Sequence, residues 1–198
     1  MADGTERAAE AATERDVAQL TQLAADADPR VRAVALAAIV RNAPRSDAGP
    51  VWMRAAADPD PGVRRRAAEV APRLGRTART GTLLALLGDP DAWVAEAAAF
   101  AIGEHPRPTP RAIDALRTAA SGHEDPLVRE AAVAALGAIG DPSTLPVVLA
   151  ACDDKPAIRR RAVLALAAFD GEEVEARLRA ALEDNDWQTR QAAEDLLA

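Results

Sequence analysis

One pattern constrains this chain more than any other feature: the same run of residue types returns six times at intervals of about 30 residues. Three copies begin with an aspartate and a proline, five have valine or isoleucine shortly after that start, and alanine stands four positions further on in all six. The β-branched positions and their equivalent in the last copy are Val31, Val63, Val94, Val128, Ile158 and Gln188. The alanines are Ala35, Ala67, Ala98, Ala132, Ala162 and Ala192. Six copies in one register predict an array of structural repeats.

Each copy predicts a helix that follows a tight turn. The aspartate stands where a helix N-cap accepts a backbone hydrogen bond, and the proline stands where a missing N–H costs nothing. Apolar residues at positions 0, +4 and +7 or +8 line one helical face, and a second apolar-periodic segment precedes every cap. The sequence therefore predicts an all-α fold of about six helix pairs. The predicted N-caps are Asp28, Asp60, Asp91 and Asp125.

The clearest copy, DPLVREAAVAALGAIGDP at residues 125–142, resembles the HEAT repeats, specifically the short HEAT-like repeats of the phycobilisome (bilin) lyases. The resemblance implies a right-handed α-α solenoid whose second helices line a concave face. We expect a tail or frayed helix at residues 1–12 and a single solenoid domain at 13–198. Its predicted repeats cover about 13–43, 44–76, 77–106, 107–140, 141–170 and 171–198.

One arginine position recurs within the repeats, at Arg32, Arg64, Arg129 and Arg159. The resemblance implies a ladder in which each arginine bonds the capping aspartate or carbonyls of adjacent turns, and the planar guanidinium suits that role because it satisfies two acceptors at once. The alternative is a basic stripe that binds a ligand. Ala95 and Thr189 depart from the pattern.

Few residues suggest catalysis. His105 and His123 each stand beside a glutamate, but both fall at loops, and a metal site needs more ligands than these two dyads offer. Cys152 lies on an apolar helical face, where a small buried hydrophobe is the more common role than a nucleophile. We therefore expect no catalytic residue, no metal ligand and no cofactor, and the sequence leans away from an enzyme without deciding the question.

Charge and composition limit the partners. The formal charge is −7 and the isoelectric point about 4.9, which weighs against nucleic-acid binding because such affinity depends on neutralising phosphates. The start of the chain has no apolar signal segment, no stretch approaches a membrane span, and the lone Cys152 fits a reducing compartment. We expect a cytoplasmic protein without a membrane partner. The sequence does not fix its oligomeric state, and we favour a monomer.

The predicted concave face mixes small residues with charge and isolated large apolar residues, a composition that suits a binding groove, although an ordinary alanine-rich solvated face is the alternative. We expect Trp93 and Trp187 to pack on neighbouring turns. The candidate binding residues are Arg65, Arg66, Glu69, Arg73, Glu96, Phe100, Glu104, Glu130, Arg160, Arg161 and Leu164.

These residues predict a non-enzymatic scaffold that binds a protein or peptide in the groove. The bound segment would be acidic towards both ends, with a basic and apolar middle. The alternative is an enzyme or accessory lyase-type subunit acting on a small-molecule or carrier-bound substrate, since the resemblance also covers such proteins.

Overall fold

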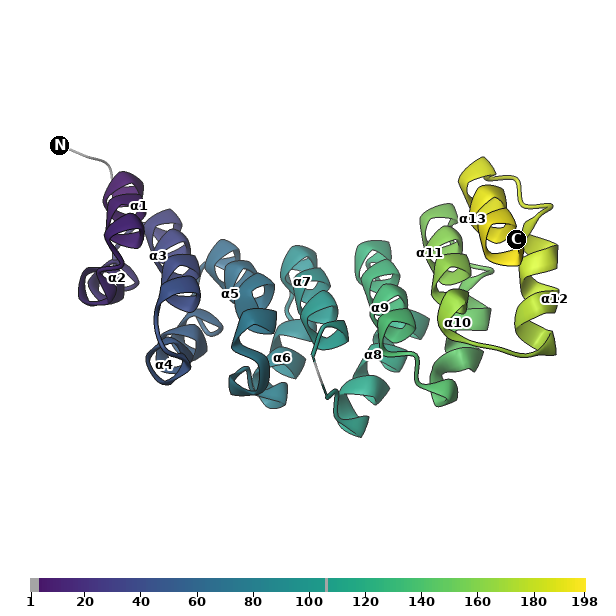
Figure 1. Cartoon of the computed structure of the whole chain (residues 1–198), viewed down its shortest axis with the longest axis horizontal. Coiled ribbons are helices and arrows are strands. Elements are labelled where there is room, and N and C mark those ends of the chain that lie inside the picture. Colours follow the sequence, from purple (N-terminus) through teal and green to yellow (C-terminus); the bar gives the residue numbers. More distant parts are fainter. Residues whose placement is uncertain (1–3, 106) are drawn as a thin grey trace. The chain divides into compact units, whose positions relative to one another are not determined.

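The computed structural model describes residues 4–105 and 107–198, and within them the chain is built from α-helices joined by short turns and three 3-10 turns (Figure 1). No strand occurs among these residues, so the all-α prediction is confirmed. The 3-10 turns are η1 (Gly75–Thr77), η2 (Pro142–Thr144) and η3 (Leu166–Ala168).

The helices alternate as the repeat pattern predicts, with a first and a second helix in every copy. The first helices are α2 (Val17–Leu23), α4 (Arg45–Ala55), α6 (Thr80–Leu87), α8 (Pro110–Gly122), α10 (Leu145–Ala151) and α12 (Glu172–Ala181). The second helices are α3 (Pro29–Asn42), α5 (Pro61–Leu74), α7 (Ala92–Gly103), α9 (Pro126–Ile139), α11 (Pro156–Ala165) and α13 (Trp187–Leu197).

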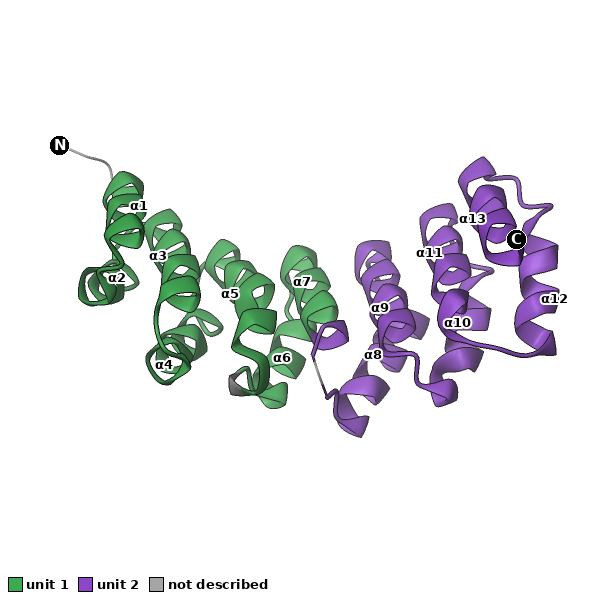
Figure 2. Cartoon of the chain, in the orientation of Figure 1, with its two compact units in different colours: residues 1–101 green, residues 102–198 purple. Residues whose placement is uncertain are grey.

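The chain divides into two compact units, residues 1–101 and 102–198 (Figure 2). Within the first unit α3 packs against both α1 (Gly4–Glu14) and α5, and within the second unit α11 packs against both α9 and α13. The second helices α3, α5, α9, α11 and α13 therefore each have a second helix of the adjoining repeat beside them, which is the packing that repeat architectures use to bury their apolar faces.

Helix α1 lies mostly within the segment for which the sequence predicts a tail or a frayed helix. It is an α-helix whose Ala8 and Ala11 are fully buried, and it packs on α3. Its small buried residues allow close approach to α3, so this helix adds to the core of the first unit.

The predicted N-caps are confirmed. Asp28, Asp60, Asp91 and Asp125 each accept a hydrogen bond from a backbone N–H two positions later, at distances from 2.8 to 3.0 Å. The repeated alanines are also placed in the core as expected, since five of the six are fully buried; in the last copy Ala192 is buried but Ala193 is the fully buried one.

The register predicted for the last copy is wrong by one residue. Asp186 caps α13, and Thr189, three positions after the cap, is buried where the other copies place a β-branched residue; Gln188 is exposed. Arg190 therefore holds the position of the recurring arginine, and Thr189 keeps a β-branched side chain at the position where the other copies have valine or isoleucine.

Candidate protein-interaction surfaces

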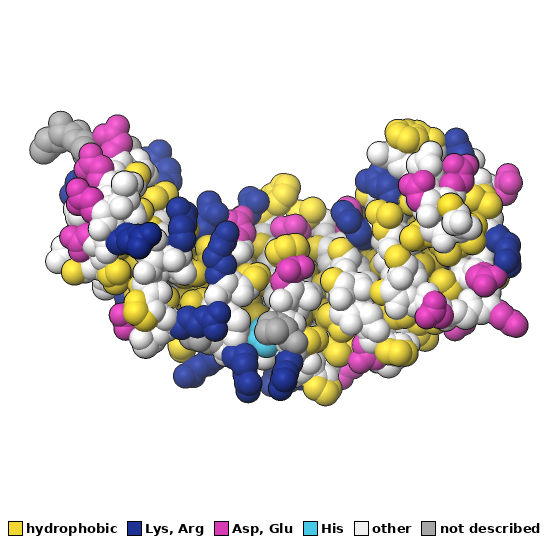
Figure 3. Space-filling model, in the orientation of Figure 1, with side chains coloured by type: hydrophobic (Ala, Val, Ile, Leu, Met, Phe, Trp, Pro, Cys, Tyr) yellow, Lys and Arg dark blue, Asp and Glu magenta, His cyan; other side chains and the backbone are white. Residues whose placement is uncertain are grey.

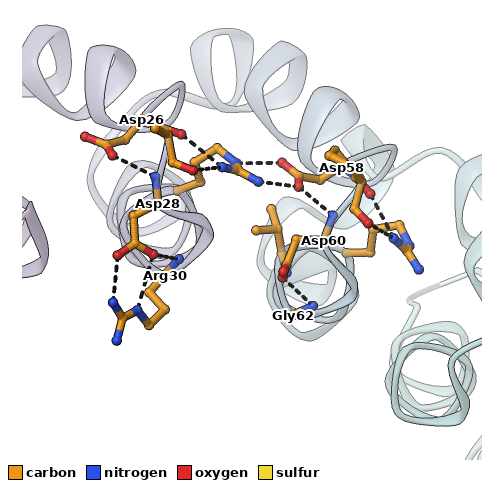
Figure 4. A network of polar contacts seen from close by, with 11 residues as sticks. Asp26, Asp28, Arg30, Asp58, Asp60 and Gly62 are labelled. Carbon is orange, nitrogen blue, oxygen red and sulfur yellow. Dashed lines mark hydrogen bonds and ion pairs between the residues drawn. The ribbon is translucent and has the colours of Figure 1, made fainter.

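The recurring arginines form a ladder inside each unit, as the resemblance implies, but their aspartate partner is a different one. Arg32 binds both carboxylate oxygens of Asp58 at 2.7 and 2.8 Å, and Asp58 precedes the capping Asp60 by two residues (Figure 4). The same carboxylate accepts the backbone N–H of Asp60 at 2.9 Å. Asp58 thus fixes the turn between two helices and joins it to the preceding repeat.

The other steps repeat this geometry. The bidentate pairs are Arg64 with Asp89, Arg129 with Asp154 and Arg159 with Asp184. The remaining nitrogen of each arginine, Nη1, donates to one or two carbonyls of the turn before its own helix. In the last copy Arg190 makes these carbonyl bonds, to Asp184 and Asn185. Because the four bidentate arginines are engaged in structure, the alternative of a ligand-binding basic stripe at this position is not supported.

The ladder predicts a specific acid sensitivity. Hydrogen bonds from Arg64, Arg129 and Arg159 hold the pKa values of Asp89, Asp154 and Asp184 below their ordinary range. A carboxylate whose pKa is lowered by folding stabilises the fold above its unfolded pKa, about 3.9, and that contribution is lost as the pH falls through the folded pKa.

We therefore expect the urea midpoint to be insensitive to these groups near neutral pH and to fall steeply below about pH 4. The Asp154→Asn variant should be less stable near neutral pH and lose less stability on acidification, measured by urea titrations across the acid range. Parallel pH profiles for the variant and the wild type would contradict this role of the ladder.

The first unit brings three of the candidate residues together on α5. Glu69 binds Arg65 at 2.9 Å and Arg66 at 2.6 Å, and the Arg65 guanidinium carbon lies 5.2 Å from the centroid of the Trp93 ring on α7. Both arginines are thus paired within the protein. Such pairs at an exposed surface contribute little to stability, and one net positive charge remains on this trio.

Helix α7 presents two exposed aromatic side chains on the same face. Trp93 and Phe100 are each 55% exposed and stand seven positions apart, or about 10 Å along the helix. Ala97 between them is buried, and Glu96 is half-buried and engaged in interactions. Packing of Trp93 on the neighbouring turn was expected; the exposure of its ring corrects that prediction, and Trp187 is likewise 64% exposed. Only Trp52 is fully buried, donating to the Ala67 carbonyl at 2.7 Å.

The second unit carries four more candidates on α9 and α11. Arg161 approaches Glu130 at 3.5 Å, and Arg160 donates to the side-chain oxygen of Gln188 on α13. Leu164 is 44% exposed and lines a shallow groove of about 320 Å³ between α9 and α11, whose other walls are mostly alanine. Glu104 is exposed just beyond the end of α7 and forms no ion pair with a described residue.

The residues with catalytic potential are occupied by structural roles. Each histidine accepts a loop N–H through Nδ1, His105 from Arg107 and His123 from Asp125. Cys152 is buried, its thiol faces the Val148 carbonyl, and burial raises its pKa, which disfavours the thiolate. Among the described residues no three His, Cys, Asp or Glu side chains gather in a way that would hold a metal ion.

Alternating helix pairs, with a ladder of arginines and aspartates joining their turns, define a helical repeat solenoid of the α-α class. The family model for HEAT repeats matches residues 80–157, and the model for the PBS lyase HEAT-like repeat matches 158–184. The chain belongs to the HEAT-repeat family, with repeats of the PBS lyase type. In the part of the chain that the structure describes, no helix is both long enough and apolar enough to cross a membrane.

Several solved structures share the fold. The complex of CpcE and CpcF of phycocyanin lyase from Nostoc is 21% identical, with a TM-score of 0.63 over 77% of this chain and 99% of that one. YibA from E. coli is 18% identical, with a TM-score of 0.70 over 90% and 68% of the chains. A designed armadillo repeat protein in complex with the peptide (KR)4 is 16% identical, with a TM-score of 0.64 over 90% and 97%. No curated protein matches the sequence.

Proposed function

We propose that this chain is a non-enzymatic scaffold that binds a protein or peptide on the outward face of its second helices. The observation that carries the proposal is the exposed pair Trp93 and Phe100 on α7, with the Arg65 guanidinium of α5 over the Trp93 ring. Exposed aromatic side chains beside arginine are the residues that most often dominate binding energy in protein interfaces. The designed armadillo protein that binds (KR)4 supports the proposal by showing a peptide bound on the same class of fold.

The test uses peptides selected from a random displayed library on the wild-type chain. We expect the Trp93→Ala, Phe100→Ala variant to weaken the selected peptides about 30-fold, because loss of an interface hot spot typically costs about 2 kcal/mol or more. Binding is measured by fluorescence anisotropy.

Met53→Ala is the matched control, since Met53 is 42% exposed in the same unit but lies on the first helix α4. Equal binding by the wild type and the Trp93, Phe100 variant would overturn the assignment of this face. Equal weakening in the Met53 variant would indicate non-specific hydrophobic adsorption.

A lyase-type enzyme or accessory subunit is the second candidate. It is favoured by the match of residues 158–184 to the PBS lyase HEAT-like repeat and by the fold shared with the CpcE and CpcF complex. Transfer or release of bilin on phycocyanin by the purified chain, alone or with a second subunit, would establish this function and is followed by visible absorbance. An unchanged spectrum together with peptide binding would favour the scaffold.

A further inference from the structure

The formal charge is divided unevenly along the chain. Residues 29–79 contain eleven arginines and four acidic residues, a formal charge of +7 within a protein of charge −7. Residues 1–28 carry −5, and residues 80–101 carry −3 without a single basic residue. The strongly basic segment is therefore bounded on both sides along the sequence by acidic ones.

Part of this positive charge gathers at one place in the first unit. Arg73 lies in the last turn of α5, Arg76 in η1 and Arg79 at the N-cap of α6. Arg45, the first residue of α4, reaches the same turn: a Cβ added to Gly75 would lie 3.7 Å from its guanidinium nitrogen. We call Arg45, Arg73, Arg76 and Arg79 the arginine cluster. Figure 3 shows basic side chains gathered in the region of α4 and α6.

The arginine cluster differs from those arginines of the same segment that form ion pairs. Arg32, Arg64, Arg65 and Arg66 each bind a carboxylate. The four members of the cluster are all exposed, and none forms an ion pair with any carboxylate of the described residues. Like charges gathered without counter-charges repel one another, so the four arginines are unfavourable to one another.

Local helix chemistry explains only part of the cluster. Arg73 near the C-terminus of α5 is favoured by the helix dipole, whereas Arg45 and Arg79 stand at helix N-termini, where a cation is disfavoured. Neither α4 nor α6 has a side-chain hydrogen bond at its N-cap, and arginine at the N-cap of α6 occupies a position that normally holds aspartate or serine. Two arginines thus break a local stability rule at one place, which is the pattern expected where function outweighs stability.

We propose that the arginine cluster is a docking site for a short carboxylate-rich segment of a polypeptide partner. Four guanidinium groups and two uncapped helix N-termini all favour an anion, and the guanidinium fork matches a carboxylate in bidentate geometry. A short acidic segment covers the cluster alone. A long polyphosphate would extend over the acidic surroundings, so nucleic acid fits less well.

The inference rests on the proposed function only in taking the partner to be a polypeptide, and it concerns a different surface. The probe is a fluorescein-labelled, glutamate-rich peptide of about ten residues, about 33 Å long when extended. We expect Arg73→Gln, Arg76→Gln to weaken its binding about tenfold at low salt, measured by anisotropy, and to flatten the salt dependence, since fewer charge contacts are lost as salt rises.

The control variant Arg15→Gln, Arg54→Gln removes the same charge from exposed arginines of the same unit outside the cluster. It should change affinity less than twofold, about the effect expected of net charge alone. Equal weakening by both variants, or none by either, would overturn the proposal. Tighter, cluster-dependent binding of a single-stranded oligonucleotide of equal charge would replace it with a phosphate-binding surface.

Two further measurements keep the outcomes separate. The helical circular dichroism and melting temperature of the cluster variant should match or exceed those of the wild type, because the removed charges repel; a lowered melting temperature would show that these arginines are structural. The Trp93→Ala, Phe100→Ala variant should keep its affinity for the glutamate-rich peptide. Its loss would place that peptide on the α7 face and overturn the cluster as the site.

Discussion

Replacing Arg129 by alanine should destabilise the second unit by about 2–4 kcal/mol, measured as the free energy of unfolding in urea. The Arg129 side chain binds Asp154 at 2.8 and 3.0 Å and the carbonyls of His123 and Glu124 at 2.8 and 3.2 Å. Alanine removes four hydrogen bonds and leaves a largely buried carboxylate with only the backbone N–H of Lys155 as a donor. Arg129→Lys should recover little, because an ammonium group does not reproduce the fork.

Arg179→Ala provides the matched control. Arg179 also binds a carboxylate, that of Glu175 at 2.6 Å, but both side chains are exposed and lie one turn apart on α12. An exposed pair of this kind contributes about 0.3–0.5 kcal/mol. The double variant Arg129→Ala, Asp154→Ala should lose less free energy of unfolding than the two single variants lose together. The reason is that the double variant no longer contains a carboxylate without its arginine partner. Equal losses for Arg129→Ala and Arg179→Ala would contradict the ladder as a source of stability.

The ladder also shows how far sequence reasoning reaches. Recurrence of arginine at one register position left a ligand-binding stripe and a structural ladder both open, and the resemblance to HEAT-like repeats implied the ladder. The capping aspartate, which the resemblance implied as an acceptor for the arginine, is not its partner. Five of the six turns before the second helices contain two aspartates, and only the folded turn shows that Asp58 binds Arg32 while Asp60 caps α5. The predicted register of the last copy is wrong by one residue because Gln188 and Thr189 are polar, so the apolar pattern that aligns the other copies is missing there.

The candidate surfaces depend on tertiary structure to different degrees. The pairing of Arg65 and Arg66 with Glu69 follows from helical spacing, which brings residues three and four apart onto one face. Helical spacing does not predict the exposure of Trp93. Whether a large apolar residue at the start of a helix is buried depends on which residues of the neighbouring helices lie beside it. The arginine cluster is visible only in the fold, because Arg45 meets the end of α5 through the packing of α4, thirty residues upstream of Gly75.

The second large effect is expected at Gly137, near the end of α9. A Cβ at this residue would lie 2.6 Å from the Ala165 Cβ and 2.9 Å from the Ala165 Cα, where α9 packs against α11. Real Cβ atoms do not approach backbone so closely, so Gly137→Ala must push α9 and α11 apart. We expect a loss of about 1–3 kcal/mol, even after the gain of about 0.5–1 kcal/mol that alanine brings to a helix.

Gly81→Ala separates the steric effect from the helix propensity of alanine. Gly81 lies in α6, and a Cβ there would meet nothing within 4 Å. This variant should be unchanged or stabilised by up to about 1 kcal/mol, because it receives the propensity gain without the clash. Urea titrations of both variants give the comparison. A Gly137→Ala protein as stable as Gly81→Ala would mean that α9 and α11 can separate at no cost. The absence of a side chain at Gly137 would then not be what allows these two helices to pack so closely.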